Sequence, residues 1–248
     1  MKVIKLKKLL RNHFPCEAIV PLAFVLITQF FCYFIPKMFV ANGWYLKIFD
    51  FTTNFDIKTP FIPSAIIIYF GCYAFWVIGI FVAYKVKNKK IPYDSVLSLL
   101  ICHIICFMIY LIMPTTTNIR PDLSNYEGKN IFMLICKLCF ESDTPYNLFP
   151  SMHVTVTWFC YIAIRRNKDI SFGYRLFTLL FSFAIFASIL LTKQHYVWDI
   201  LPSIILCEFV YFVVKRTKLS LKFKILCFKI NKIIKIDKLI EKQEKGDV

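Results

Sequence analysis

Long apolar runs are the feature that most restricts how this 248-residue chain can fold. A helix needs about 20 consecutive apolar residues to cross a bilayer, and several runs approach that length. Hydrophobic residues make up 58% of the chain, above the roughly 45–50% of ordinary soluble domains. We therefore expect an all-α, polytopic membrane protein with six transmembrane helices. The predicted spans are 18–40, 61–84, 95–113, a short one from Ser151 to just before Arg165, 174–192 and 196–214.

These spans divide the chain into a basic N-terminal arm (1–17), a membrane domain (18–214) and a basic tail (215–248). Residues 131–140 are apolar but too few to cross, so we predict a re-entrant or interfacial helix there. Apolar residues of the tail recur at steps of four and three, which favours an amphipathic helix lying on anionic headgroups, although a local strand is an alternative. The recurring residues are Leu219, Phe223, Leu226, Ile230 and Ile233.

The basic residues lie mostly on one side of the predicted spans. The two termini and the loops at 85–90 and 165–175 hold 24 of the 31 Lys and Arg residues. Positively charged loops stay in the cytoplasm, so both termini are predicted to be cytoplasmic in a multi-pass protein of the plasma membrane. This orientation and the membrane lipids account for the net charge of +16, so we expect no nucleic-acid partner.

Polar residues from three separate segments fall together on the extracytoplasmic side. Ser151 and His153 open an apolar run, where a helix N-terminus offers free backbone N–H groups to an anion. His195 and Asp199 are four residues apart at the start of a helix and therefore share a face. The carboxylate can hold one imidazole nitrogen and leave the other free to attack. Two cations, Arg120 and Lys193, lie within reach of the same surface.

These residues suit phosphoryl transfer: a nucleophile, an orienting carboxylate, a general acid and a phosphate clamp. Arg120-Pro121, then Pro150-Ser151-Met152-His153, then Ser188 with His195 and Asp199 resemble the three motifs of the type 2 phosphatidic acid phosphatase (PAP2) superfamily. The resemblance implies a metal-independent lipid phosphate phosphohydrolase or phosphotransferase without a cofactor. It makes His195 the nucleophile that becomes a phosphohistidine, with His153 as the general acid and Asp199 orienting His195. Arg120 and Ser151 would bind the phosphate of the lipid substrate.

Three departures from the family's motifs concern the phosphate clamp and its neighbours. Met113 stands at the Lys of the first motif, Met152 at the Gly of the second and Ile189 at the Arg of the third. We expect Lys193 to be the substitute cation.

Two alternatives to hydrolysis remain open. One segment, 56–63, is similar to the inositolphosphotransferase and sphingolipid-synthase-like branch, so an inositol- or choline-headgroup phosphotransferase is the first. A non-catalytic lipid-phosphate carrier or scaffold is the second.

Several chemically capable residues are interpreted as structural. Cys136 and Cys139 form a lone CxxC without a second pair, so we expect no metal site. His103 lies in the third span without a motif. Glu208, deep in the sixth span, is expected to turn inward onto a backbone or hydroxyl partner.

Overall fold

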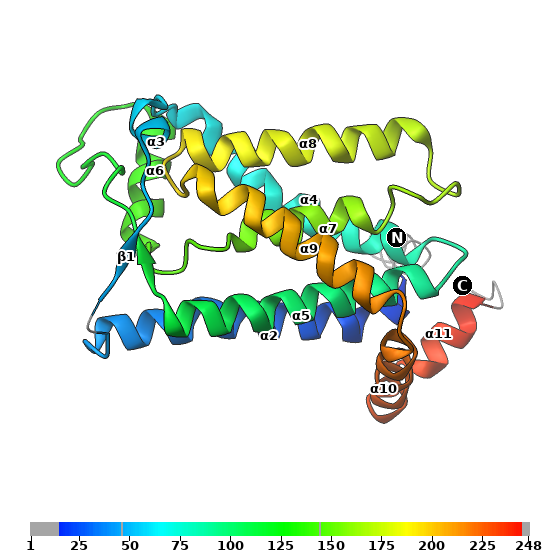
Figure 1. Ribbon diagram of the computed structural model, residues 1–248. Coiled ribbons are helices and arrows are strands. Elements are labelled where there is room, and N and C mark those ends of the chain that lie inside the picture. The colour runs from blue at the N-terminus through cyan, green and yellow to red at the C-terminus, as the bar shows by residue number, and fades with distance from the viewer. Residues whose placement is uncertain (1–14, 46, 144, 245–248) are drawn as a thin grey trace.

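The computed structural model describes residues 15–45, 47–143 and 145–244. The chain folds into a bundle of long helices, with short elements at both ends (Figure 1). The bundle helices are α2 (Ile19–Ala41), α4 (Ile66–Tyr84), α5 (Lys90–Ile112), α7 (Met152–Ile162), α8 (Phe172–Leu191) and α9 (Ile200–Val214). The prediction of a predominantly helical membrane protein is confirmed.

Five described helices are long and apolar enough to cross a bilayer. With adjoining 3-10 turns, they cover Cys16–Ala41, Pro63–Tyr84, Lys90–Ile112, Phe172–Leu191 and Val197–Val214. The predicted fourth span forms a helix, α7, of only 11 residues. At 1.5 Å per residue this helix is about 16 Å long, roughly half the thickness of a hydrocarbon core.

Helix α7 lies at the centre of the bundle and contacts α4, α5, α8 and α9. Eight of its 11 residues are buried. Two tryptophans hydrogen-bond across its contacts: Trp76 Nε1 donates to Thr157 Oγ1 of α7 at 2.8 Å, and Trp158 Nε1 of α7 donates to Glu208 at 2.9 Å. Glu208 also forms an ion pair with Arg165, so its partners are an arginine and an indole and not the expected backbone or hydroxyl group.

Successive bundle helices run in alternating directions, so the two ends of the bundle receive different loops (Figure 1). One end carries α3 (Asn54–Lys58), α6 (Ile131–Ser142) and a short parallel pairing of β1 (Phe49–Asp50) with β2 (Thr115–Thr116). The predicted short helix at 131–140 is therefore present as α6. This end also holds the start of α7 and the turn from α8 into α9, where the predicted site residues lie.

The opposite end carries α10 (Leu219–Ile233) and α11 (Asp237–Glu244). The predicted helix at 219–233 is confirmed, and the alternative of a strand is wrong. Phe223 and Cys227 of α10 are buried, and the ring of Phe223 packs 5.9 Å from that of Phe24 on α2. Leu221, Ile225 and Phe228 remain exposed on the outer side of the helix.

Side-chain caps fix where the shorter helices begin. Ser151 caps α7 by accepting a hydrogen bond from the N–H of Val154 at 3.3 Å. Asn130 caps α6 in the same manner. Thr53 and Asp56 form a reciprocal capping box at α3. Each side chain satisfies N–H groups that a helix start leaves unpaired, so the sequence determines these starts locally.

Candidate active site

His195 and Asp199 form the centre of the candidate site. His195 Nδ1 lies 2.8 Å from Asp199 Oδ2, and both side chains are almost completely buried. The same carboxylate oxygen accepts the backbone N–H of Tyr196 at 3.2 Å. When Asp199 is ionised, it only accepts hydrogen bonds, and His195 Nδ1 then carries the proton while Nε2 keeps its lone pair.

Ser151 and His153 of the start of α7 meet His195 on its free side. Ser151 Oγ lies 3.3 Å and His153 Nδ1 lies 3.1 Å from His195 Nε2. Ser203 of α9 accepts the backbone N–H of Ser151 at 2.8 Å and donates to the carbonyl of Asp199. Segments more than 40 residues apart therefore meet at one imidazole, as the sequence predicted for residues 151, 153, 195 and 199.

Asp56 organises the turn that carries His195 and Asp199. It is 2% exposed, and its Oδ1 accepts the N–H of Val197 at 2.7 Å while its Oδ2 accepts the N–H of Thr53 at 2.9 Å. This carboxylate therefore ties the capping box of α3 to the 3-10 turn η3 (Val197–Asp199). The sequence analysis included Asp56 only as the first residue of the segment 56–63. Its capping spacing with Thr53 was visible, but its partner lies 141 residues away.

Arg120 lies beside the histidine site, but its guanidinium is occupied by protein acceptors. Nη2 donates to Gln194 Oε1 at 2.7 Å, Nε donates to the carbonyl of Lys193 at 3.3 Å, and Nη1 donates to the carbonyl of Asp143. All three nitrogens thereby hold the loops around His195. Gln194 is a residue that the sequence analysis missed, and only its place next to His195 could have suggested it.

Lys193 turns away from His195. Its Nζ donates to the carbonyl oxygens of Asp56, at 2.5 Å, and Thr59. Its backbone adopts a left-handed conformation (φ 56°), in which the N–H of Gln194 reaches back to the carbonyl of Ile189 at 2.9 Å. This is the hydrogen-bonded turn that ends many helices, with a lysine where glycine is most common. Lys193 therefore shapes the turn into His195 and does not face it.

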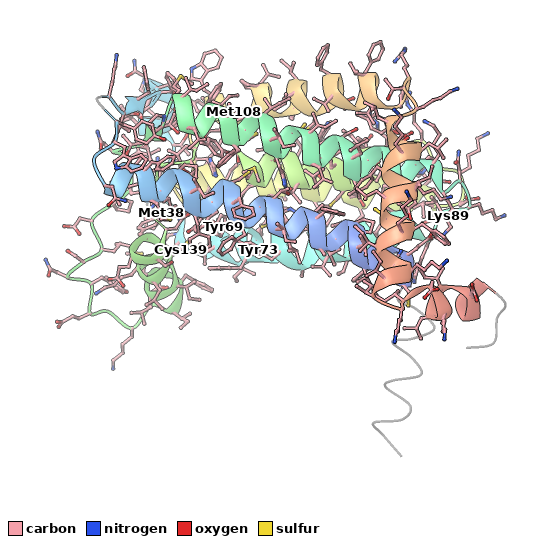
Figure 2. All side chains as sticks on the ribbon, turned by 90° about the horizontal axis from the view of Figure 1, so that it is seen from below. Met38, Tyr69, Tyr73, Lys89, Met108 and Cys139 are labelled. Carbon is pink, nitrogen blue, oxygen red and sulfur yellow. The ribbon has the colours of Figure 1, made fainter. Side chains whose placement is uncertain are left out.

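A cavity of about 500 Å³ leads to the two histidines. Its walls are residues of α2 and α4, and its polar end includes His153, His195, Gln194, Asp143 and Lys37. In Figure 2, Tyr69 and Tyr73 lie along α4 next to α2, with Cys139 of α6 close to Tyr69. Arg120, Ser151 and Lys193 are not among the residues that line it.

The mouth of this cavity lies on the side of the bundle. Leu26 and Phe30 of α2 and Phe70 of α4 line the cavity and are each about half exposed, at 57%, 56% and 45%. These large apolar side chains cover the lateral surface of the bundle at α2 and α4.

Burial lowers the pKa of His195 well below its ordinary value of 6.5. The neighbouring His153 and Arg120 act in the same direction, because a second positive charge beside either group is unfavourable. His195 is therefore a neutral imidazole at physiological pH, with Nε2 available as a nucleophile or base.

A buried, oriented histidine therefore lies beside a second histidine at one end of an apolar helical bundle. The family model of the PAP2 superfamily matches residues 44–213, well over half of the chain. The chain belongs to the PAP2 superfamily, whose members are in general phosphatases or phosphotransferases. No curated protein and no solved structure matches the chain significantly.

Proposed function

We propose that the protein is a metal-independent membrane enzyme that removes or transfers a phosphoryl group of a lipid phosphate or phosphodiester. The observation that carries the proposal is the pair of contacts at His195: Asp199 holds Nδ1 at 2.8 Å, and Nε2 faces Ser151 and His153 at the end of the cavity. A carrier of lipid phosphates has no need for a histidine oriented in this way.

In the proposed reaction His195 Nε2 attacks phosphorus and the ester P–O bond breaks. The leaving oxygen takes a proton from the imidazolium form of His153, which the negative charge of the bound phosphate favours. The phosphohistidine keeps its Nδ1 proton, and the Asp199 carboxylate stabilises the positive charge of its ring. Water or an alcohol then attacks phosphorus and gives its proton to His153, which releases His195.

The lateral cavity supports a lipid as substrate. Its apolar walls between α2 and α4 suit a hydrocarbon chain, and its polar end suits a phosphate. We infer that the apolar helices lie in the plasma membrane with α7 as a short sixth crossing, both termini in the cytoplasm and the site on the extracytoplasmic side. The basic helix α10 would then lie on anionic headgroups of the inner leaflet.

Trapping the covalent intermediate tests the proposed function. The purified protein in detergent is given phosphatidic acid labelled at phosphorus and quenched in alkali, which preserves phosphohistidine. We expect labelled protein from the wild type and none from His195→Gln. His103→Gln is the matched control, because His103 is a buried histidine whose side chain contacts Thr28 of α2 and does not line the cavity.

Absence of label and of turnover with every lipid phosphate tested would contradict the proposal. Repeating the assay with inositol, or with a diacylglycerol whose acyl chains differ from those of the substrate, distinguishes water from an alcohol as the acceptor. Release of free phosphate indicates hydrolysis, and a new labelled lipid or a labelled inositol phosphate indicates transfer to an alcohol.

A further inference from the structure

The phosphate clamp predicted from sequence lacks a cation that faces the cavity. Met113 and Ile189 replace two basic residues of the family motifs. The two predicted clamp cations, Arg120 and Lys193, donate to protein carbonyls and to Gln194, and neither of them lines the cavity. An anion that enters the cavity must therefore find its positive partner elsewhere.

Within the described part of the chain, Lys37 is the only lysine or arginine that lines the cavity. It lies near the C-terminal end of α2, outside the region matched by the family model. Its side chain is 14% exposed, so the surrounding residues restrict its position at the polar end of the cavity. A primary ammonium in such a half-enclosed site interacts with an anion far more strongly than one in open water.

Asp143 and Tyr33 hold Lys37 in this position. Lys37 Nζ lies 2.6 Å from Asp143 Oδ1 and 3.5 Å from the centre of the Tyr33 ring. The Tyr33 hydroxyl donates to the same carboxylate oxygen at 2.8 Å. An ammonium has three N–H donors, and the carboxylate uses one and the ring face another. At least one donor stays available for a ligand oxygen.

Asp143 also connects Lys37 with the histidine site. The Asp143 backbone carbonyl accepts a hydrogen bond from Arg120, which in turn holds Gln194 next to His195. Gln194 and Asp143 line the same cavity as Lys37 and the histidines. The amide of Gln194 donates only to a thiol, Cys139 Sγ at 3.3 Å, which is a weak acceptor that a phosphate oxygen can replace.

We propose that Lys37 is the cation that binds the phosphate group of the substrate in this cavity, with Asp143 and Tyr33 as its positioning residues. The assignment rests on the proposed function for the identity of the substrate, but it concerns anion binding and can be measured without turnover. The ligand chemistry is a phosphate group, whether it belongs to a lipid or is free in solution.

Inorganic phosphate is the probe for the first experiment. The melting temperature of the detergent-solubilised protein is measured against phosphate concentration for the wild type, Lys37→Met and Lys37→Arg. We expect stabilisation of the wild type, a 10- to 100-fold weaker apparent affinity for Lys37→Met, as for loss of a charge-assisted hydrogen bond, and a retained response for Lys37→Arg. Lys129→Met, an exposed lysine at the same end, is the matched control and should behave as the wild type.

Kinetics with phosphatidic acid form the second experiment, because they separate this inference from the proposed function. Lys37→Met should raise the KM for the lipid and the inhibition constant of inorganic phosphate by a similar factor. If both constants stay within twofold of wild type while His195→Gln is inactive, Lys37 is not the clamp and the proposed function stands. If neither the wild type nor any variant turns over lipid, but phosphate still stabilises the protein through Lys37, phosphate binding by Lys37 is supported and the proposed function is contradicted. If phosphate does not stabilise the wild type, the clamp is overturned.

Discussion

His153 Nδ1 lies 3.1 Å from His195 Nε2, so the two imidazoles share one hydrogen bond at the end of the cavity. Because His195 Nδ1 donates to Asp199, His153 is the donor in this contact. A phosphorus atom cannot fit between two nitrogens at that distance. A bound phosphate must therefore replace this hydrogen bond and separate the rings. The imidazole of His153 already lies beside the rings of Tyr69 and Trp76, whose centres are 5.0 and 5.7 Å from its own.

Replacing His153 by alanine should affect substrates according to their leaving groups. An alkoxide of a lipid needs a proton to leave, and general acid catalysis supplies about 10²- to 10⁴-fold in rate. We expect His153→Ala to lose that factor in kcat with phosphatidic acid and much less with 4-nitrophenyl phosphate, whose phenolate leaves unaided. Comparing kcat for the two substrates in one preparation checks the prediction. Equal losses would assign His153 a role other than the general acid.

The pKa of His195 predicts how stability depends on pH. Its pKa in the folded protein lies well below 6.5, while in the unfolded chain it returns to about 6.5. Below pH 6.5 the unfolded state binds a proton that the folded state does not, so stability should fall as the pH decreases from about 6.5. The melting temperature in detergent, measured between pH 7.5 and 5, should fall less steeply for His195→Gln. Identical slopes for the two proteins would show that His195 is not the group concerned.

Asp56→Ala should impair catalysis indirectly, because Asp56 holds the turn that carries the catalytic residues and does not contact the substrate itself. The change leaves the partly buried N–H groups of Val197 and Thr53 without their carboxylate partner, which costs less than the roughly 1–3 kcal/mol of a fully buried unpaired group. Since Val197 begins the turn that contains Asp199, we expect a lower kcat with a nearly unchanged KM and a lower melting temperature. Asp122 is an exposed loop carboxylate at the same end, and Asp122→Ala should leave kcat and the melting temperature unchanged. A normal kcat in Asp56→Ala would contradict the positioning role.

Local sequence patterns predicted much of this molecule. The lengths of the apolar runs predicted the long helices, and the four-residue spacing predicted the contact between His195 and Asp199. The distribution of basic residues predicted that the motif residues lie at one end of the bundle. Two outcomes depended on tertiary contacts and were not predictable in this way. Arg120 and Lys193 are held by backbone carbonyls whose positions depend on loop geometry. Lys37 and Asp143 are 106 residues apart and no periodicity connects them.

The length of the fourth predicted span was also not predictable from local sequence patterns. The sequence predicted a short span from Ser151, and α7 is shorter still, with 11 residues. Hydropathy does not distinguish a helix that faces lipid from one that is enclosed by other helices. Thr157 and Trp158 of α7 form hydrogen bonds with Trp76 and Glu208, and the sequence alone did not show these contacts.

The contact between α4 and α7 supplies a prediction for the packing around this central helix. A Cβ at Gly79 of α4 would lie 2.7 Å from the sulfur and 2.9 Å from the Cβ of Cys160 on α7. Both residues lie inside their helices, so Gly79→Ala should push α4 and α7 apart and destabilise the protein by about 1–3 kcal/mol. Gly173→Ala is the matched control, because nothing lies within 4 Å of its Cβ and alanine favours helix. We expect a lower melting temperature for Gly79→Ala, partial recovery in Gly79→Ala combined with Cys160→Gly, and no loss for Gly173→Ala. Equal melting temperatures for the two alanine variants would show that α4 and α7 are not in close contact.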